Sequence, residues 1–242
     1  MRIVMALLLS CVMLLAACDN GLSFADPALD ACVRSFAPGG GHLTQKDLDE
    51  IKQLFCGNPG GGTEPDPTEN IVRLDGIEML RNLEELHLGV THISDLSPLR
   101  HLEKLKEMGI HTDRKINSYV PLCDLRLTGI GISGAELEDI NFLANIPTLE
   151  RLYLEDNKIS DISVIKQLPV LTSIDVSYNK VTSIKALAEH PNIANFTEVS
   201  VSYNCIDCAA ETGYRKLIET KNPDLEVFCS SEEQFLPENC SE

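Results

Sequence analysis

The sequence predicts an α/β solenoid, in which short strands alternate with tight helical turns in a stack of repeats. A motif with apolar residues at its first, fourth and sixth positions recurs every 22 residues, and a further copy follows after 25. The copies begin at Leu83, Leu105, Leu127, Leu149, Leu171 and Phe196. Within each unit the apolar spacing changes from two, which suits a strand, to three, which suits a 3₁₀ turn. Units this small cannot bury an apolar face alone, so neighbouring units must share one core.

The charge of the chain excludes one broad class of partner. Its 242 residues include 37 acidic and 20 basic side chains, so the formal net charge is −17. This length is enough for a domain with a substantial core. Because phosphate polyanions need a positive binding surface, we expect no nucleic acid among its partners.

Residues 1–17 are predicted to be a secretory signal peptide. A positive start at Arg2 precedes an apolar run from Ile3 to Ala17, which is too short for a comfortable transmembrane helix. The end of this run, Leu15-Ala-Ala-Cys18, resembles the lipobox of bacterial lipoproteins, in which the cysteine carries the lipid. The resemblance implies an exported chain, anchored to a bacterial membrane by acyl chains such as palmitate on Cys18 and facing the periplasm or the surface. The alternative is an ordinary signal peptide cleaved near Ala17.

The next segments are a tether over 18–23, an N-terminal cap over 24–56 and a loop over 57–70. Asp26 before a proline predicts a helix start, and Thr44 predicts a second one. Residues 51–56 are expected to form a first, irregular strand. The stretch that follows is rich in Gly and Pro, which is typical of a surface loop.

The repeats over 71–204 resemble the leucine-rich repeat, with its pattern L-x-x-L-x-L-x-x-N-x-I. A buried asparagine amide in this pattern can satisfy backbone groups where the chain leaves the strand. That position is occupied by Asn157, Asn179 and Asn204, and in the earlier copies by Thr91, Asp113 and Ala135. The 22-residue length and the phrase from Leu74 to Leu83 are similar to the bacterial internalin-type subclass. The resemblance implies a right-handed superhelix with a parallel concave sheet, a helical N-terminal cap and a disulfide-linked C-terminal cap.

One repeat departs from the pattern. The copy that begins at Leu105 is one residue out of step at Ile116 and Leu122, which predicts a distorted repeat. Cys123 lies in this repeat and is left without a partner. We expect its thiol to be buried and inert rather than reactive.

The remaining cysteines are expected to stabilise the two ends, because export favours disulfides. Cys32 and Cys56 are well placed to link the N-terminal cap. Residues 205–242 form the predicted C-terminal cap, whose cysteines are Cys205, Cys208, Cys229 and Cys240. Of the three possible pairings we favour Cys205 with Cys229 and Cys208 with Cys240. The alternative is a zinc site, which usually has two C-x-x-C motifs where this segment has one.

The concave face of the sheet is the predicted binding surface. Side chains that alternate with the buried leucines point outward from it and include acids, an arginine and tyrosines. The expectation that this face binds a protein or cell-envelope partner follows from the fold by analogy. The residues expected to make contacts are Glu85, His87, Arg151, Tyr153, Asp175 and Tyr178.

Other kinds of site are less well supported by the sequence. Glu85, Glu107, His87 and His111 could in principle offer ligands to a divalent ion, but acids and histidines also occur on such a face without one. The chain has no G-x-S-x-G, H-E-x-x-H or P-loop motif, so we expect neither an enzyme nor a cofactor. The sequence therefore predicts a monomeric, membrane-anchored binding protein. The alternative is a structural role in the envelope without a single specific ligand.

Overall fold

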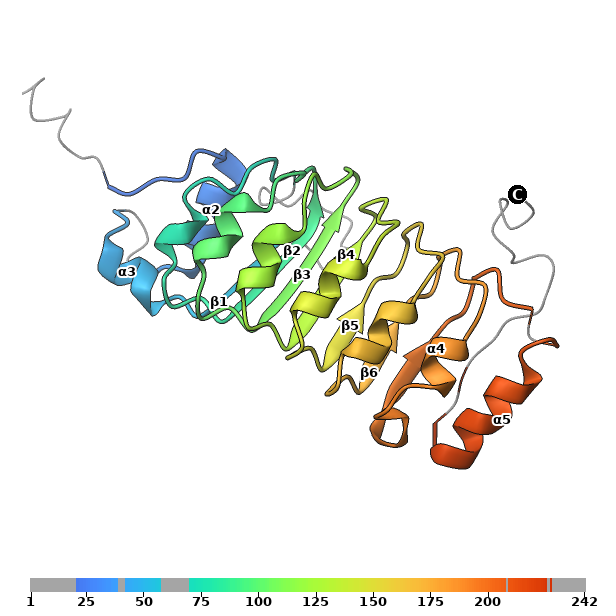
Figure 1. Ribbon diagram of the computed structural model, residues 1–242. Helices are drawn as coiled ribbons and strands as arrows, with labels where there is room; N and C mark the ends of the chain where they lie inside the picture. The colour runs from blue at the N-terminus through green and yellow to red at the C-terminus, as the bar shows by residue number, and fades with distance from the viewer. Residues whose placement is uncertain (1–20, 39–41, 58–69, 208, 226, 228–242) are drawn as a thin grey trace, which may run out of the picture.

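The computed structural model describes residues 21–38, 42–57, 70–207, 209–225 and 227. These residues form one elongated stack, with a sheet along one side and short helices along the other (Figure 1). Residues 1–20, with Cys18, most of the loop over 57–70, and Cys208, Cys229 and Cys240 lie outside the described residues. Within those ranges, no helix is both long enough and apolar enough to cross a bilayer.

The sheet confirms the predicted solenoid. The described residues form seven parallel strands that follow one another in chain order. They are β1 (Gln53–Cys56), β2 (Glu85–Thr91), β3 (Glu107–Thr112), β4 (Gly129–Ser133), β5 (Arg151–Tyr153), β6 (Ser173–Asp175) and β7 (Glu198–Ser200). The fourth residue of each motif pairs with its equivalent on the next strand, so that Leu152, for example, lies opposite Ile174. The 22-residue spacing therefore sets the register.

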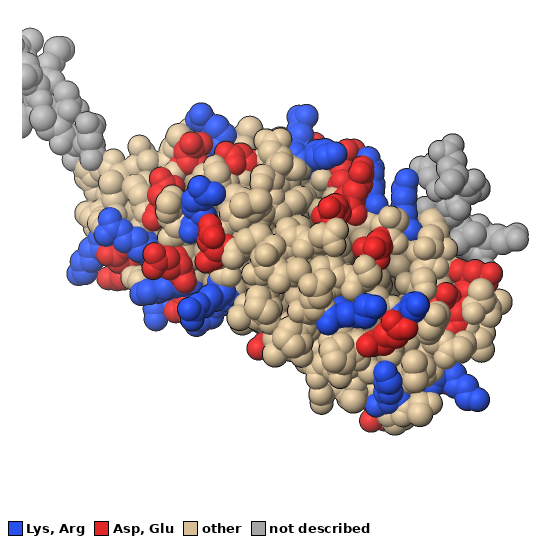
Figure 2. All heavy atoms as spheres, in the orientation of Figure 1, with Lys and Arg blue, Asp and Glu red and all other residues tan. Residues whose placement is uncertain are grey.

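Short helices return the chain from each strand to the next. They are η1 (Ile77–Met79), η2 (Ser97–His101), η3 (Val120–Asp124), η4 (Asn141–Asn145), η5 (Ser163–Gln167), α4 (Lys185–Ala188) and η6 (Ile193–Asn195). Their apolar residues and those of the strands form one continuous buried core. On the side of these helices, acidic and basic side chains lie in mixed groups around a broad uncharged area (Figure 2). This side therefore presents both signs of charge.

The N-terminal cap begins with α2 (Pro27–Phe36), and Asp26 joins it to the first repeat. One carboxylate oxygen of Asp26 accepts from the N–H groups of Ala28 and Leu29, at 2.9 and 3.1 Å. The other accepts from Val72 and Arg73, at 2.8 and 3.1 Å. The helix start is thus also a tertiary contact, which the sequence alone did not indicate.

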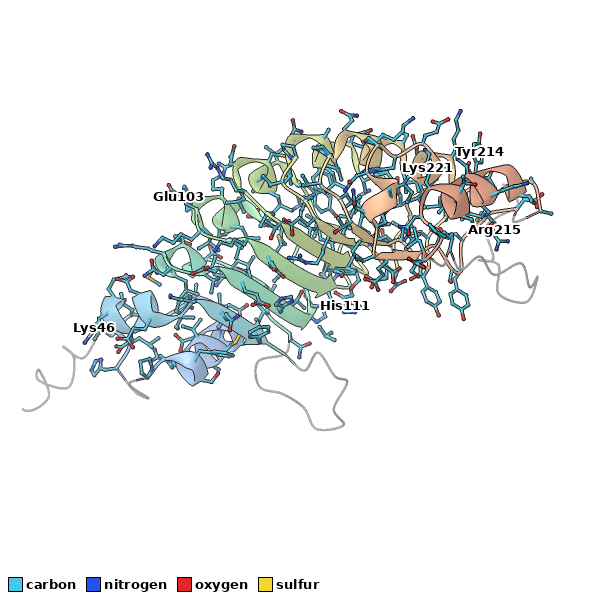
Figure 3. All side chains as sticks on the ribbon, turned by 90° about the horizontal axis from the view of Figure 1, so that it is seen from below. Lys46, Glu103, His111, Tyr214, Arg215 and Lys221 are labelled. Atoms are coloured by element: carbon cyan, nitrogen blue, oxygen red, sulfur yellow. A yellow bond between two sulfur atoms is a disulfide. The ribbon has the colours of Figure 1, made fainter. Side chains whose placement is uncertain are left out.

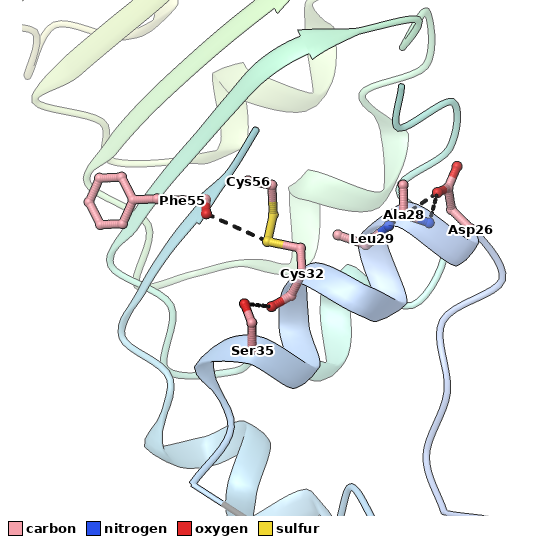
Figure 4. The surroundings of a disulfide bond; sticks show 7 residues. All are labelled: Asp26, Ala28, Leu29, Cys32, Ser35, Phe55 and Cys56. Atoms are coloured by element: carbon pink, nitrogen blue, oxygen red, sulfur yellow. Dashed lines mark hydrogen bonds between the residues drawn. A yellow bond between two sulfur atoms is a disulfide. The ribbon is translucent and has the colours of Figure 1, made fainter. Parts of the chain in front are cut away.

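A second helix and a disulfide complete this cap. α3 (Gln45–Glu50) begins at Thr44, whose hydroxyl accepts from the Asp47 N–H while the Asp47 carboxylate accepts from Thr44. Cys32 on α2 is bonded to Cys56 on β1, so the cap is covalently linked to the edge of the sheet (Figure 4). Cys123 is a half-buried free thiol, and burial raises its pKa.

The C-terminal end carries α5 (Thr212–Lys221), which packs against α4 and η6. Asn222, just after α5, donates to the carbonyls of Ile193 and Phe196 at 3.1 and 2.8 Å. Cys205 is disulfide-bonded. Cys229, its predicted partner, lies outside the described residues, and so do both members of the second predicted pair, Cys208 and Cys240. The pairing of these four cysteines therefore stays a prediction.

Asparagine side chains link each late repeat to the one before it. The Asn179 side-chain amide donates to the carbonyls of Leu154, Val176 and Ser177, at 2.8 to 3.1 Å, and accepts from the Ile159 N–H at 2.9 Å. The equivalent amides of Asn157 and Asn204 make the same kinds of bond. These contacts satisfy backbone groups where the chain leaves the strands.

In the earlier repeats, threonine hydroxyls near the same position bond to other backbone groups. The Thr91 hydroxyl donates to the His111 carbonyl, and the Thr112 hydroxyl donates to the Ile93 carbonyl, both at 2.9 Å. Thr112 is buried, whereas Asp113, which the sequence pattern placed in this position, is exposed and bonded to His92. The cause is a bulge in β2, where the register shifts between Leu88 and Val90.

The asparagine ladder gives a first prediction. Replacing Asn179 with Ala removes four hydrogen bonds and leaves the buried Ile159 N–H without a partner among the described residues, so we expect the free energy of unfolding to fall by about 3 kcal/mol. Urea unfolding followed by circular dichroism measures it. Asn117→Ala, at an exposed asparagine, is the control and should change stability little. Equal stability of the two variants would contradict the role of the ladder.

His190 gives a prediction about pH. Its ring is buried, its Nε2 lies 3.0 Å from the Ile165 carbonyl, and its Nδ1 accepts from the Asn192 N–H at 3.0 Å. Burial lowers the pKa of His190 from 6.5. The unfolded chain therefore takes up a proton that the folded chain resists, so the stability present above pH 6.5 is lost as the pH falls below it, by at most about 1.4 kcal/mol per pH unit.

The measurement is urea unfolding at pH 7.5 and pH 5.5. His190→Gln should lose part of this pH dependence, while the control His101→Gln, at an exposed histidine, should keep it. An unchanged pH dependence in His190→Gln would contradict this assignment.

Candidate functional site

The strand register arranges the outward side chains of the sheet in columns. The first column contains Glu85, Glu107, Gly129, Arg151, Ser173 and Glu198. The second contains His87, Gly109, Gly131, Tyr153, Asp175 and Ser200. Neighbouring members of a column lie about 4.8 Å apart because that is the spacing of paired strands. Figure 3 shows His111 on this sheet side and Glu103 on the side of the short helices.

A hollow of about 360 Å³ lies at the N-terminal half of this face. The Phe55 ring on β1 stacks on His87, with centroids 5.1 Å apart and planes at 1°. Gly109 leaves the room that His87 occupies, since a Cβ at this glycine would come within 2.6 Å of the His87 Nδ1. Gly131 also lines the hollow, and a Cβ there would meet its nearest atom only at 3.5 Å. The glycines therefore make the hollow, and Phe55 and His87 form one of its walls.

The histidine in this wall is held in place by its neighbours. Nε2 of His87 lies 3.0 Å from a carboxylate oxygen of Glu85, and Gln53 donates to the other oxygen at 2.6 Å. Stacking on one side and hydrogen bonding on the other fix the imidazole ring. Sequence reasoning missed Phe55, because the loop over 57–70 separates β1 from the regular repeats. The one signal in the sequence was the place of this aromatic residue in the irregular first strand.

Arg151 is bound within the protein. Its guanidinium donates to Glu107 at 2.6 Å across the intervening Gly129, and it also contacts Glu150 at 3.3 Å. A Cβ at Gly129 would lie 3.4 Å from the Glu107 Cγ and 3.6 Å from the Arg151 Nε. The ion pair thus spans β3 to β5 over the glycine. The charge of Arg151 is therefore already balanced, although the sequence analysis counted it as a contact residue.

The C-terminal half of the face is acidic. The Ser173 hydroxyl donates to Glu198 at 2.8 Å and lies 3.2 Å from the Tyr153 hydroxyl. Burial, with the nearby charges of Asp175 and Glu198, raises the pKa of Glu155. In the part of the chain that the structure describes, Glu155, Asp175 and Glu198 form no ion pair.

Two tyrosines lie at the rim beyond this acidic half. The rings of Tyr178 and Tyr203 stack, with centroids 4.2 Å apart and planes at 10°. A hydrogen bond with Tyr203 raises the pKa of the Tyr178 hydroxyl. The sequence analysis named Tyr178 as a contact residue but did not indicate the stack.

The comparisons with known proteins agree with this architecture. A family model described as leucine-rich repeats, in two copies, matches residues 147–189. The chain has the leucine-rich-repeat fold. Solved structures of Listeria monocytogenes internalins share it. Internalin C2 is 23% identical with a TM-score of 0.57, and the match covers 86% of this chain and 94% of that one.

Two further internalins extend this similarity. InlF is 20% identical with a TM-score of 0.52, covering 85% of this chain and 75% of that one. The domain of InlJ, whose description mentions a cysteine ladder, is 19% identical with a TM-score of 0.53. That match covers 86% of this chain but 46% of InlJ. A search of curated proteins finds no match. The chain is therefore internalin-like in fold.

The residues that were considered as metal ligands do not form one cluster among the described residues. Among the described residues, no group of three or more His, Cys, Asp or Glu side chains is placed to hold a metal ion. His87 contacts Glu85, Glu107 binds Arg151, and the His111 Nδ1 lies 2.8 Å from the Ser133 hydroxyl. What the leucine-rich-repeat face offers is a shaped hollow, an acidic half and exposed aromatic rings.

Proposed function

We propose that this chain is an exported lipoprotein, anchored to a bacterial membrane through Cys18, that binds a protein or other cell-envelope partner through its concave face. It acts by non-covalent binding rather than by catalysis. The hollow between Phe55 and Gly131 is the observation that supports the binding role most strongly. Ligands bind in concave, partly apolar cavities that have a few ordered polar groups.

The hollow is organised before any partner arrives. His87 is held between the Phe55 ring and the Glu85 carboxylate, so binding would cost little side-chain entropy there. An aromatic wall beside a floor of glycines fits an inserted side chain of a partner better than a flat interface would. Glu85, His87, Tyr153, Asp175 and Tyr178 are the proposed contacts, and Arg151 holds Glu107 in place.

Filling the hollow tests this proposal. Gly131→Leu adds a side chain where a Cβ meets only ordinary contacts, so the fold should persist while the cavity is occupied. Gly213→Leu adds the same side chain on α5, where a Cβ has no neighbour within 4 Å, and is the matched control. We expect capture of a stoichiometric partner from crosslinked envelope to fall by about tenfold in Gly131→Leu alone, because a partner group can no longer enter.

Partner capture by the control variant and by the wild-type chain decides between a binding role and a structural role. Equal capture by both variants would remove the hollow from the binding site. If the wild-type chain enriches no partner at all, a structural role in the envelope becomes the better explanation.

The lipid anchor has a separate test. Cys18→Ser should abolish incorporation of radiolabelled palmitate, because the serine hydroxyl does not replace the acylated thiol. Cys11→Ser changes a cysteine inside the predicted signal peptide and should leave labelling intact. A wild-type chain without label would favour an ordinary signal peptide cleaved near Ala17.

A further inference from the structure

The rim of the sheet has an unusual backbone at one repeated position. The residue just before each ladder asparagine has a left-handed φ, of 55° at Asp156, 55° at Tyr178 and 56° at Tyr203. In the preceding repeat Gly134 precedes Ala135 with a φ of 69°. This conformation suits Gly, Asn or Asp, and it costs other L-residues about 1 kcal/mol. The turn itself therefore gives no reason for two tyrosines.

The order of the strands places these residues along one line. The Tyr178 N–H donates to the Ser202 carbonyl at 3.0 Å, and the Asp156 N–H donates to the Ser177 carbonyl at 3.2 Å. Asp156 and Tyr203 therefore lie on opposite sides of Tyr178. Since Tyr203 stacks on one face of the Tyr178 ring, the other face is turned toward the Asp156 side. Tyr178 is 54% exposed, so its ring is accessible to a partner.

In the described part of the chain, acidic side chains without ion pairs lie on the same rim and face of the sheet as this ring. Asp156 is exposed, and neither it nor Glu155, Asp175 or Glu198 forms an ion pair within the described ranges. The basic side chains that follow the same turns are Lys158 and Lys180, and Lys158 is bound to Glu136 at 2.9 Å. An exposed aromatic ring attracts a cation through its quadrupole, and carboxylates that form no ion pair attract it through their charge.

We propose that the outer face of Tyr178, with Asp156 and the acidic half of the concave face, binds lysine or arginine side chains in an extended, cationic segment of the protein partner. This proposal rests on the proposed function and names the chemistry of the partner. Tyr203 supports the Tyr178 ring from behind, so that the platform is rigid. Arginine fits best, because its planar guanidinium stacks on the ring while its N–H groups reach a carboxylate.

Synthetic probes test this without knowledge of the partner. The full chain is titrated calorimetrically with hexa-arginine at about 150 mM salt, which screens general attraction to an acidic protein. Tyr178→Asn removes the ring but suits the left-handed backbone, so it should fold normally and bind hexa-arginine about fivefold more weakly. Tyr178→Phe retains the ring and should retain most of the affinity. Asp156→Asn should weaken binding about twofold.

The control removes one charge from the other side of the molecule. Glu103→Gln lies on the side of the short helices and should leave the affinity unchanged (Figure 3). Equal affinity of Tyr178→Asn and the wild-type chain would overturn the proposal, because binding would then be general charge attraction. So would binding of chitohexaose, but not hexa-arginine, at Tyr178, since the platform would then accept sugar rings.

The two proposals fail in different ways. If hexa-arginine does not bind at Tyr178 while Gly131→Leu still abolishes partner capture, the cationic site is wrong and the binding function stands. If hexa-arginine binds as expected while the wild-type chain captures no partner, the platform exists but its assignment to a protein partner is wrong.

Discussion

Everything in this molecule depends on burial that is shared between neighbouring repeats. A single unit has one strand, one short helix and apolar side chains on its inner side, and it has no second layer of its own. The seven strands of the described residues form a stable sheet because each inner leucine or isoleucine is covered by those of the adjacent repeats. Asn157, Asn179 and Asn204 complete this arrangement, because their amides satisfy backbone groups that stacking has removed from water.

Most of the fold could be predicted from the spacing of apolar residues, because the burial of those residues determines how the repeats stack. The register of Leu152 opposite Ile174, the helix starts at Asp26 and Thr44 and the positions of the ladder asparagines follow directly from local patterns. The exchange of Asp113 for Thr112 did not follow, since it depends on a bulge in the preceding strand. A pattern within one repeat carries no information about a register shift in its neighbour.

The columns of outward residues in the candidate site could be predicted from the sequence. The shape of the site could not. Alternation along the strands placed the outward residues, but pair interactions across strands decided which of them are available. Arg151 reaches Glu107 only because Gly129 lies between them. His87 lies against Phe55 only because Gly109 has no side chain. A glycine in a sequence does not by itself indicate a contact, yet here the glycines determine which side chains meet and where the surface is hollow.

The asparagine ladder has a direction, and this bears on how the chain assembles. Asn204 donates to the Val176 carbonyl and accepts from the Val181 N–H, both in the repeat that precedes its own. Each later repeat thus brings the amide that completes the earlier one. A polypeptide that emerges from its N-terminus first can then consolidate its late turns in the order of synthesis, because each of the three asparagines bonds to the turn made just before its own.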